Sequence, residues 1–171
     1  TVKPDGLVAL DVGPIGQLLE PTGVLSFEEA YDIFKEEILA GKDADVIVIE
    51  TMTDLIETKA AVLAAKENSN LPVFVTMTFE ENKRTFTGCS VSAMVLTIVG
   101  LGVDAIGVNC SLGPDQLAPI VEEIGKWSDI PVIVKANAGL PDPVTNEYDV
   151  TPEQFVEDYK EKNRGTFSFS F

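Results

Sequence analysis

Residues 45–61, DVIVIETMTDLIETKAA, contain both parts of a βα unit. The run from Asp45 to Ile49 is almost wholly apolar, which is typical of a strand covered on both faces rather than on one. After Glu50, the segment from Asp54 to Glu67 is rich in Ala, Leu, Glu and Lys, the residues that favour a helix. The stretch therefore predicts a buried strand that leads directly into a helix.

The same alternation extends in both directions along the chain. Four further runs predict strands, at Leu7–Leu10, Pro72–Thr78, Asp104–Asn109 and Pro131–Lys135. Helix signals follow them at Phe27–Leu39, Val91–Val99, Asp115–Trp127 and Thr151–Lys160. The spacing of about 26 to 40 residues is that of one crossover unit in a parallel sheet. We therefore expect an α/β fold of about five βα units.

The length limits how much of a closed barrel this chain can form. A complete (β/α)₈ barrel usually needs about 250 residues, whereas this chain has 171. We therefore expect an incomplete (β/α)₈ TIM barrel. Its first residue is Thr1 rather than Met, which is typical of a processed or excised piece.

Composition excludes several classes of partner. The chain has 12 basic and 28 acidic residues and no His, a net charge of −16. Such a surface repels phosphate backbones and anionic lipid, so we expect no nucleic-acid partner and no membrane partner. Two cysteines do not form a secreted disulfide framework, and no apolar run approaches the length of a membrane span. A cytoplasmic protein is the expectation.

Polar residues recur at the carboxyl ends of the predicted strands, where parallel α/β folds place their functional loops. The candidates in chain order are Asp11, Glu50, Thr51, Thr78, Phe79, Asn109, Cys110 and Asn137. Glu50 suits the ammonium group of an amino acid, and the alternative is a structural ion pair or a charge at the start of the next helix. Cys110 precedes a helix, a position that favours the reactive thiolate form, but a lone Cys is also a common small buried residue.

Other chemistries have less support. Without His, neither a Ser-His-Asp triad nor a Cys-His pair can form, and there is no phosphate-binding glycine loop. Cys89 precedes a predicted helix and is interpreted as a buried structural residue. Lys135 ends a strand, where a lysine could form a Schiff base with a carbonyl substrate, although no acid/base partner is evident nearby.

Several stretches together resemble the homocysteine S-methyltransferase family, especially the domain found in cobalamin-dependent methionine synthases. They are VIVIETMTDLIETKAA, PVFVTMTF, GVDAIGVNCSLGP and VIVKANAGLPDP, together with LDVGPIGQLLEP near the start. The resemblance runs from about Leu7 to Lys160 and makes the five predicted strands the third to seventh of the family's barrel.

The resemblance implies a site for homocysteine and a metal. Cys110 is similar to the first of three zinc-binding cysteines, and Asn137 to the residue that occupies zinc's fourth position before substrate arrives. Glu50 is similar to the acceptor for the homocysteine ammonium, and Asp11, Thr78 and Asn109 are expected to shape the substrate site. In the family, zinc (Zn²⁺) activates the homocysteine thiolate, which takes a methyl group from methylcobalamin carried by a corrinoid-binding module.

The sequence departs from the family's pattern in two ways. The family's remaining zinc cysteines form a GGCC motif that is absent here, and the chain instead ends in RGTFSFSF. We therefore expect a partial homocysteine-binding domain over residues 1–162 and an atypical tail over residues 163–171, either an edge strand or a foreign end. The resemblance predicts a methyltransferase as the parent protein, whereas this piece alone should bind zinc poorly and be inactive.

Three alternatives stay open. Related enzymes that use betaine or S-methylmethionine as the methyl donor share the cysteine pattern. Open sheet edges favour self-association, or completion of the barrel by a partner chain in a noncatalytic module. The Schiff-base enzyme built on Lys135 is the third.

Overall fold

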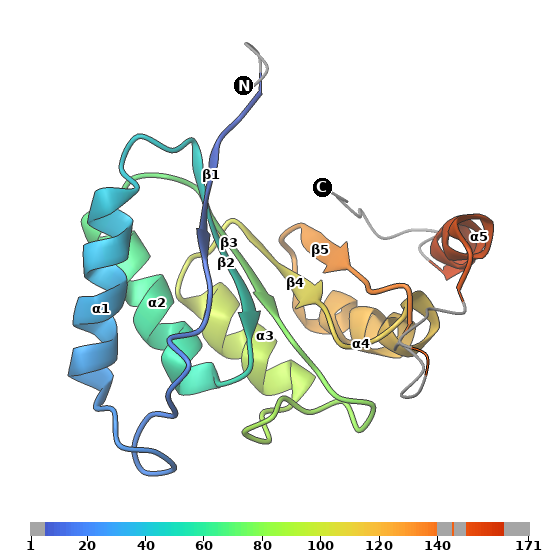
Figure 1. Cartoon of the computed structure of the whole chain (residues 1–171), viewed down its shortest axis with the longest axis horizontal. Helices are drawn as coiled ribbons and strands as arrows, with labels where there is room; N and C mark the ends of the chain where they lie inside the picture. The colour runs from blue at the N-terminus through green and yellow to red at the C-terminus, as the bar shows by residue number, and fades with distance from the viewer. Residues whose placement is uncertain (1–5, 140–144, 146–149, 163–171) are drawn as a thin grey trace.

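A computed structural model of the chain describes residues 6–139, 145 and 150–162. Strands and helices alternate throughout these ranges (Figure 1). The elements are β1 (Ala9–Val12), α1 (Phe27–Ala40), β2 (Val46–Met52), α2 (Leu55–Asn68), β3 (Val73–Met77), α3 (Val91–Gly100), β4 (Ala105–Asn109), α4 (Pro114–Trp127), β5 (Val132–Lys135) and α5 (Pro152–Lys162). The predicted α/β class and its five βα units are confirmed.

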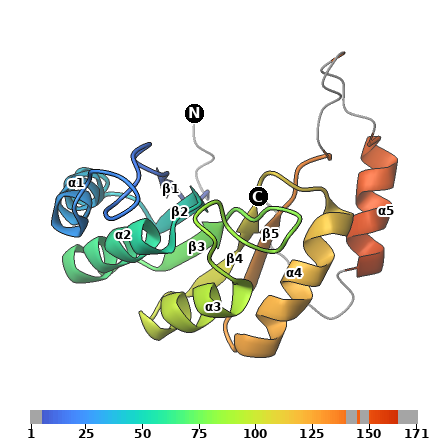
Figure 2. The same cartoon turned by 90° about the horizontal axis from the view of Figure 1, so that it is seen from below.

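All five strands are parallel and follow one another in chain order across the sheet. Helices α1 to α4 cover one face of the curved sheet, and α5 lies beside α4 (Figure 2). Parallel neighbours place all strand carboxyl ends at one edge of the sheet, which is hereafter called the rim. Loops after β1 to β5 leave from the rim.

The hydrophobic core lies between the sheet and the helices. Alternate strand residues, such as Ile47, Ile49, Val73 and Val75, are fully buried on the helix-covered side. Their strand neighbours, such as Val48, point to the opposite face and are only partly buried. This alternation follows from the period of two in a strand, and it leaves the side chains of the second face available to line a cavity.

Local signals in the sequence account for the helix boundaries. Ser26 caps α1, and Glu29 returns the interaction to the Ser26 backbone, so the predicted capping box is present. Asp54 caps α2, where one carboxylate oxygen accepts hydrogen bonds from the backbone N–H groups of Ile56 and Glu57. These caps fix where each helix starts after the rim loops.

Two boundaries differ from the prediction in ways that matter for the site. β1 starts at Ala9 and continues to Val12, so Asp11 lies inside the strand rather than after it. β2 continues to Met52, so Glu50 and Thr51 are also strand residues. The polar side chains of Asp11, Glu50 and Thr51 interrupt the apolar runs, so the sequence placed the ends of both strands too early. The predicted tail, residues 163–171, lies outside the described residues.

Of the helices within the described ranges, none combines the length and apolar character that crossing a membrane requires.

Candidate functional site

A bulge near the end of β2 shapes the rim. Ile49 pairs with Val75 and Met52 with Met77, so two residues of β2, Glu50 and Thr51, stand opposite one residue of β3. Thr51 has a φ of 62°, a left-handed conformation that is unusual for a β-branched residue. Bulges of this kind re-aim side chains and are frequent beside active sites.

The side-chain amide of Asn109 stabilises this bulge. Its Oδ1 accepts hydrogen bonds from the Thr51 backbone N–H at 2.9 Å and from Thr76 Oγ1 at 2.8 Å. Its Nδ2 donates to Thr51 Oγ1 at 2.8 Å. Asn109 is only 2% exposed, so its hydrogen bonds are made within the protein and connect β2, β3 and β4.

The same amide reaches the candidate metal ligand. Asn109 Nδ2 also lies 3.3 Å from Cys110 Sγ, and Thr51 Oγ1 lies 3.9 Å from the same sulfur. Cys110 and Ser111 have φ values of 59° and 50°. Thr51 therefore lies beside Cys110 and its neighbour Ser111, and all three residues have a left-handed backbone. Backbone strain of this kind is frequent at functional sites.

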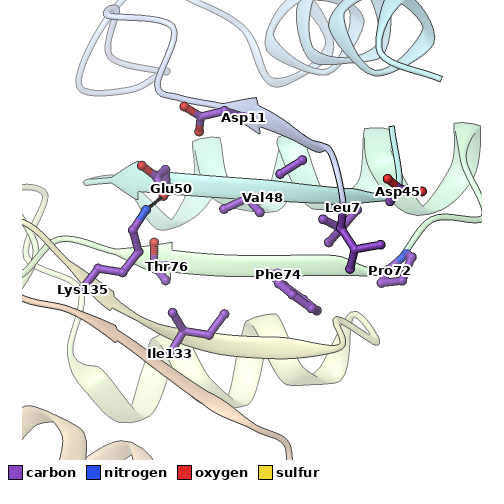
Figure 3. Close-up of a pocket in the computed structure, with 12 residues that line it drawn as sticks. Leu7, Asp11, Asp45, Val48, Glu50, Pro72, Phe74, Thr76, Ile133 and Lys135 are labelled. Carbon is purple, nitrogen blue, oxygen red and sulfur yellow. Dashed lines mark hydrogen bonds and ion pairs between the residues drawn. The ribbon is translucent and has the colours of Figure 1, made fainter. Parts of the chain in front are cut away.

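Glu50 and Lys135 form an ion pair across the concave face of the sheet. Figure 3 shows Lys135 Nζ in contact with the Glu50 carboxylate, with Thr76 beside the lysine stem. Both residues line a cavity of about 350 Å³ whose wall is mostly apolar, with Val48, Phe74 and Ile133 among the lining residues. The site thus has a charged end at the rim and an apolar wall below it.

The remaining predicted residues also lie at or near the rim. Asp11 lines the same cavity as Glu50. Thr78 follows β3, and its Oγ1 donates to the backbone carbonyl of Asn109 at 3.0 Å. Asn137 follows β5, and its backbone N–H donates to the Leu112 carbonyl in the loop after Cys110. These candidates therefore share the rim, but Asp11 on β1 and Asn137 after β5 lie at opposite ends of the strand order. Phe79, also a candidate, is fully buried.

The described residues do not fit a complete zinc site. Zinc in proteins takes four ligands, or three and an open position in enzymes. Within residues 6–139, 145 and 150–162, no three His, Cys, Asp or Glu side chains are grouped so as to bind a metal ion. Cys110 supplies one thiol and Asn137 one amide, and the second cysteine, Cys89, packs against the hydrophobic core.

Three residues of the site were not expected as such from the sequence. Thr51 was named only as a strand-end residue, Thr76 was not singled out, and Lys135 was considered only as a Schiff-base lysine. In the structure, Lys135 forms an ion pair with Glu50, a carboxylate partner that the sequence did not indicate. One sequence feature could have indicated these three residues: each is a polar residue near the end of an apolar strand.

Comparison with known proteins identifies the family to which this fold and rim belong. The family model described as homocysteine S-methyltransferase matches residues 1–168. The chain belongs to the homocysteine S-methyltransferase family. It is 34% identical over 155 residues to methionine synthase of Mycobacterium leprae, a match that covers 85% of this chain and 13% of the relative.

Solved structures agree on the fold. The apo form of the homocysteine methyltransferase MmuM from Escherichia coli matches with a TM-score of 0.69 at 17% identity, over 95% of this chain and 55% of that one. Its metallated form matches with a TM-score of 0.58 at 15% identity, over 81% and 46%. The prediction of a partial TIM-barrel fold is confirmed, and the chain spans little more than half of this homocysteine S-methyltransferase relative.

Proposed function

We propose that this chain is the part of a methionine synthase-type homocysteine S-methyltransferase that binds the amino acid substrate. In the whole protein, the homocysteine thiolate takes a methyl group from methylcobalamin and becomes methionine. The observation that carries the proposal is the convergence of Cys110, Asn109 and Glu50 at one rim in a chain of this family. A corrinoid-binding module of the parent protein is the proposed partner, and the cytoplasm the proposed location.

Each proposed substrate contact has a physical reason. The Glu50 side chain is 21% exposed, so an ammonium group that reaches its carboxylate is largely withdrawn from water, and the attraction between the two charges is strengthened. Asp11 adds a second negative charge to the wall of the same cavity. Thr78 and Asn109 fix the shape of the rim through their mutual hydrogen bond.

In this proposal, the whole protein binds zinc and this chain supplies only part of the ligand set. Cys110 is the proposed first thiolate ligand and Asn137 the proposed replaceable ligand, and two further cysteines must come from elsewhere. When bound, the metal would favour the thiolate form of homocysteine. One thiol and one amide are too few ligands for tight binding, so we expect this chain alone to bind zinc weakly and to be inactive.

A test of this proposal compares the chain with its parent protein. We expect the parent to form methionine from homocysteine and methylcobalamin, and a Cys110→Ser variant of the parent to lose both bound zinc and activity. Atomic absorption on the purified 171-residue chain should detect far less than one zinc per chain. One tightly bound zinc per chain, or full activity of Cys110→Ser, would show that the ligand assignment is wrong.

The methyl donor is the least constrained part of the proposal. Betaine and S-methylmethionine are the alternatives, and the identity to a protein described as methionine synthase favours methylcobalamin. Supplying each donor in turn to the parent protein separates them. Methionine formed only with betaine or S-methylmethionine would replace the cobalamin assignment and leave the homocysteine site unchanged.

A noncatalytic role is the second candidate, because β1 and β5 each have one neighbour in the described sheet. An open parallel edge exposes unpaired backbone groups that another chain can join. Size-exclusion chromatography distinguishes the two candidates, because completion by a partner or a second copy requires an assembly. A monomer at all concentrations would argue against this role.

A further inference from the structure

The ion pair between Lys135 and Glu50 spans the open face of the sheet. Lys135 is on β5 and Glu50 on β2, with β3 and β4 between them. Their side chains are 31% and 21% exposed, so each charge has lost much of its contact with water. A charge in this position is costly unless a partner of opposite sign stays beside it.

No second basic side chain lines the cavity among the residues that the structure describes. Among its described lining residues, Lys135 is the one basic side chain, whereas Asp11, Asp45 and Glu50 are acidic. Figure 3 shows Asp45 with Leu7 and Pro72 at the other end of the cavity from the Glu50–Lys135 pair. A ligand that separates the pair must therefore supply a positive charge for Glu50, and a negative charge on the same ligand can pair with the displaced Lys135.

We propose that Glu50 and Lys135 together bind the zwitterionic head group of an α-amino acid, with Glu50 accepting hydrogen bonds from its ammonium group and Lys135 donating to its carboxylate. This inference rests on the proposed function and adds the residue that recognises the carboxylate. Without substrate, the two residues neutralise each other. With substrate, each exchanges one partner for another, so neither charge is left alone.

Charge balance makes the pair selective for zwitterions. An amine without a carboxylate would occupy Glu50 and leave Lys135 unpaired, and an acid without an ammonium group would do the reverse. Leaving one member of a desolvated pair alone is strongly unfavourable. The apolar wall formed by Val48, Phe74 and Ile133 adds contact for an aliphatic side chain but does not distinguish the head groups.

Calorimetric titration of the 171-residue chain with three thiols tests the inference. The ligands are L-homocysteine, 3-mercaptopropylamine, which lacks the carboxylate, and 4-mercaptobutanoate, which lacks the ammonium group. Wild type is compared with Lys135→Met, which keeps the apolar stem, and Lys135→Arg, which keeps the charge. Lys126→Met is the matched control, because Lys126 is an exposed lysine on α4.

Wild type should bind L-homocysteine at least about tenfold more tightly than either analogue, since one lost charge pair of this kind is worth that much or more. Lys135→Met should weaken L-homocysteine binding by about tenfold and tighten binding of 3-mercaptopropylamine, because Glu50 has lost its competitor. Lys135→Arg should stay close to wild type, and Lys126→Met should match it. A purely structural role for Lys135 would weaken all three ligands together.

Equal binding of L-homocysteine by wild type and Lys135→Met, or no binding to wild type at millimolar concentration, overturns the inference. A different result would separate it from the proposed function. If L-2-aminobutyrate, which has no sulfur, binds with the same dependence on Lys135 while the parent protein methylates no thiol, the head-group site stands and the methyltransferase proposal fails.

Discussion

The side-chain nitrogen of Asn109 lies 3.3 Å from the sulfur of Cys110, the residue that follows it in the chain. Because the same amide also binds Thr51 and Thr76, the position of the thiol is coupled to the bulge in β2 and therefore to Glu50. A single buried amide thus connects the proposed metal ligand to the proposed head-group site. Changes to any of these contacts should affect both.

Removing the Asn109 amide should destabilise the whole rim. Asn109→Ala leaves Thr51 N–H and Thr76 Oγ1 without their acceptor in a buried position. The expected loss is about 2 to 4 kcal/mol in the free energy of unfolding, measured by urea denaturation. Asn70→Ala, at an exposed position, is the control and should change it by less than about 0.5 kcal/mol. Equal effects at the two positions would contradict the account.

The left-handed backbone at Thr51 predicts which of two substitutions there, glycine or alanine, gives the more stable protein. Glycine adopts a φ of 62° without the steric cost of a side chain. We therefore expect Thr51→Gly to be more stable than Thr51→Ala by about 1 kcal/mol, although both lose the hydroxyl contacts. At Thr53, which is outside the positive-φ residues, alanine should instead be the more stable substitution. Thermal denaturation of the four variants measures both differences.

Gly107 on β4 tolerates no side chain. A Cβ at this position would overlap the backbone carbonyl of Ile133 on β5. Gly107→Ala should therefore separate the two strands that carry Asn109 and Lys135, at a cost of about 3 kcal/mol or more. Gly125→Ala is the control, because its Cβ would meet nothing within 4 Å and alanine favours a helix by about 1 kcal/mol. Similar denaturation midpoints for the two variants would be inconsistent with this packing.

The order of the elements was predicted well because short apolar runs alternate with longer helix-forming stretches along the chain. The continuous apolar runs indicated strands covered on both faces, whereas in the described part of the chain helices cover one face and the other face lines the cavity. The start of β2 and both ends of the helix after Asp54 were located to within about one residue, inside the usual uncertainty of element boundaries. The extension of β2 through Met52 was missed, because a bulge with a left-handed Thr51 has no distinctive residue pattern. Local sequence cannot show that a threonine adopts φ above zero when the stabilising contact comes from Asn109, 58 residues later.

The sequence predicted which residues lie at the strand ends of the candidate site, but not which of their side chains contact one another. Parallel topology alone brings Glu50, Asn109 and Cys110 to one rim. The pairing of Glu50 with Lys135 depends on sheet curvature, which allows a side chain on β5 to reach β2 across two strands, and curvature is a property of the assembled sheet. The roles given to Asp11, Thr78 and Asn137 in substrate and metal binding remain predictions.

Glu57 provides a pH-dependent test of the contact between α2 and the loop after β1. It is 3% exposed, and its Oε1 accepts a hydrogen bond from the Ile15 backbone N–H at 2.7 Å. Burial raises the pKa of this carboxyl; the Ile15 hydrogen bond opposes the increase and the Asp54 charge adds to it. The folded chain therefore retains this proton to higher pH than the unfolded chain does.

A raised carboxyl pKa contributes stability that is complete below the unfolded-state pKa and is lost as pH rises through the folded-state pKa. Above about pH 4, where glutamate in the unfolded chain ionises, Glu57 should make wild type lose stability relative to Glu57→Gln. The variant retains an acceptor for Ile15 and lacks the charge. Glu36→Gln, at an exposed position, is the control for the remaining acidic groups. Parallel stability curves for wild type and Glu57→Gln would refute this assignment.

The central claim is that Cys110 and Glu50 serve one small-molecule site, and thiol–disulfide exchange followed by peptide mass spectrometry tests it directly. L-homocystine can form a mixed disulfide with either cysteine and releases one homocysteine; burial raises the pKa of the Cys89 thiol and should slow its reaction. We predict that L-homocystine labels Cys110 faster than the uncharged 2-hydroxyethyl disulfide does, and that Glu50→Gln removes this preference. Labelling of Cys110 at the same relative rate in wild type and Glu50→Gln would contradict the claim.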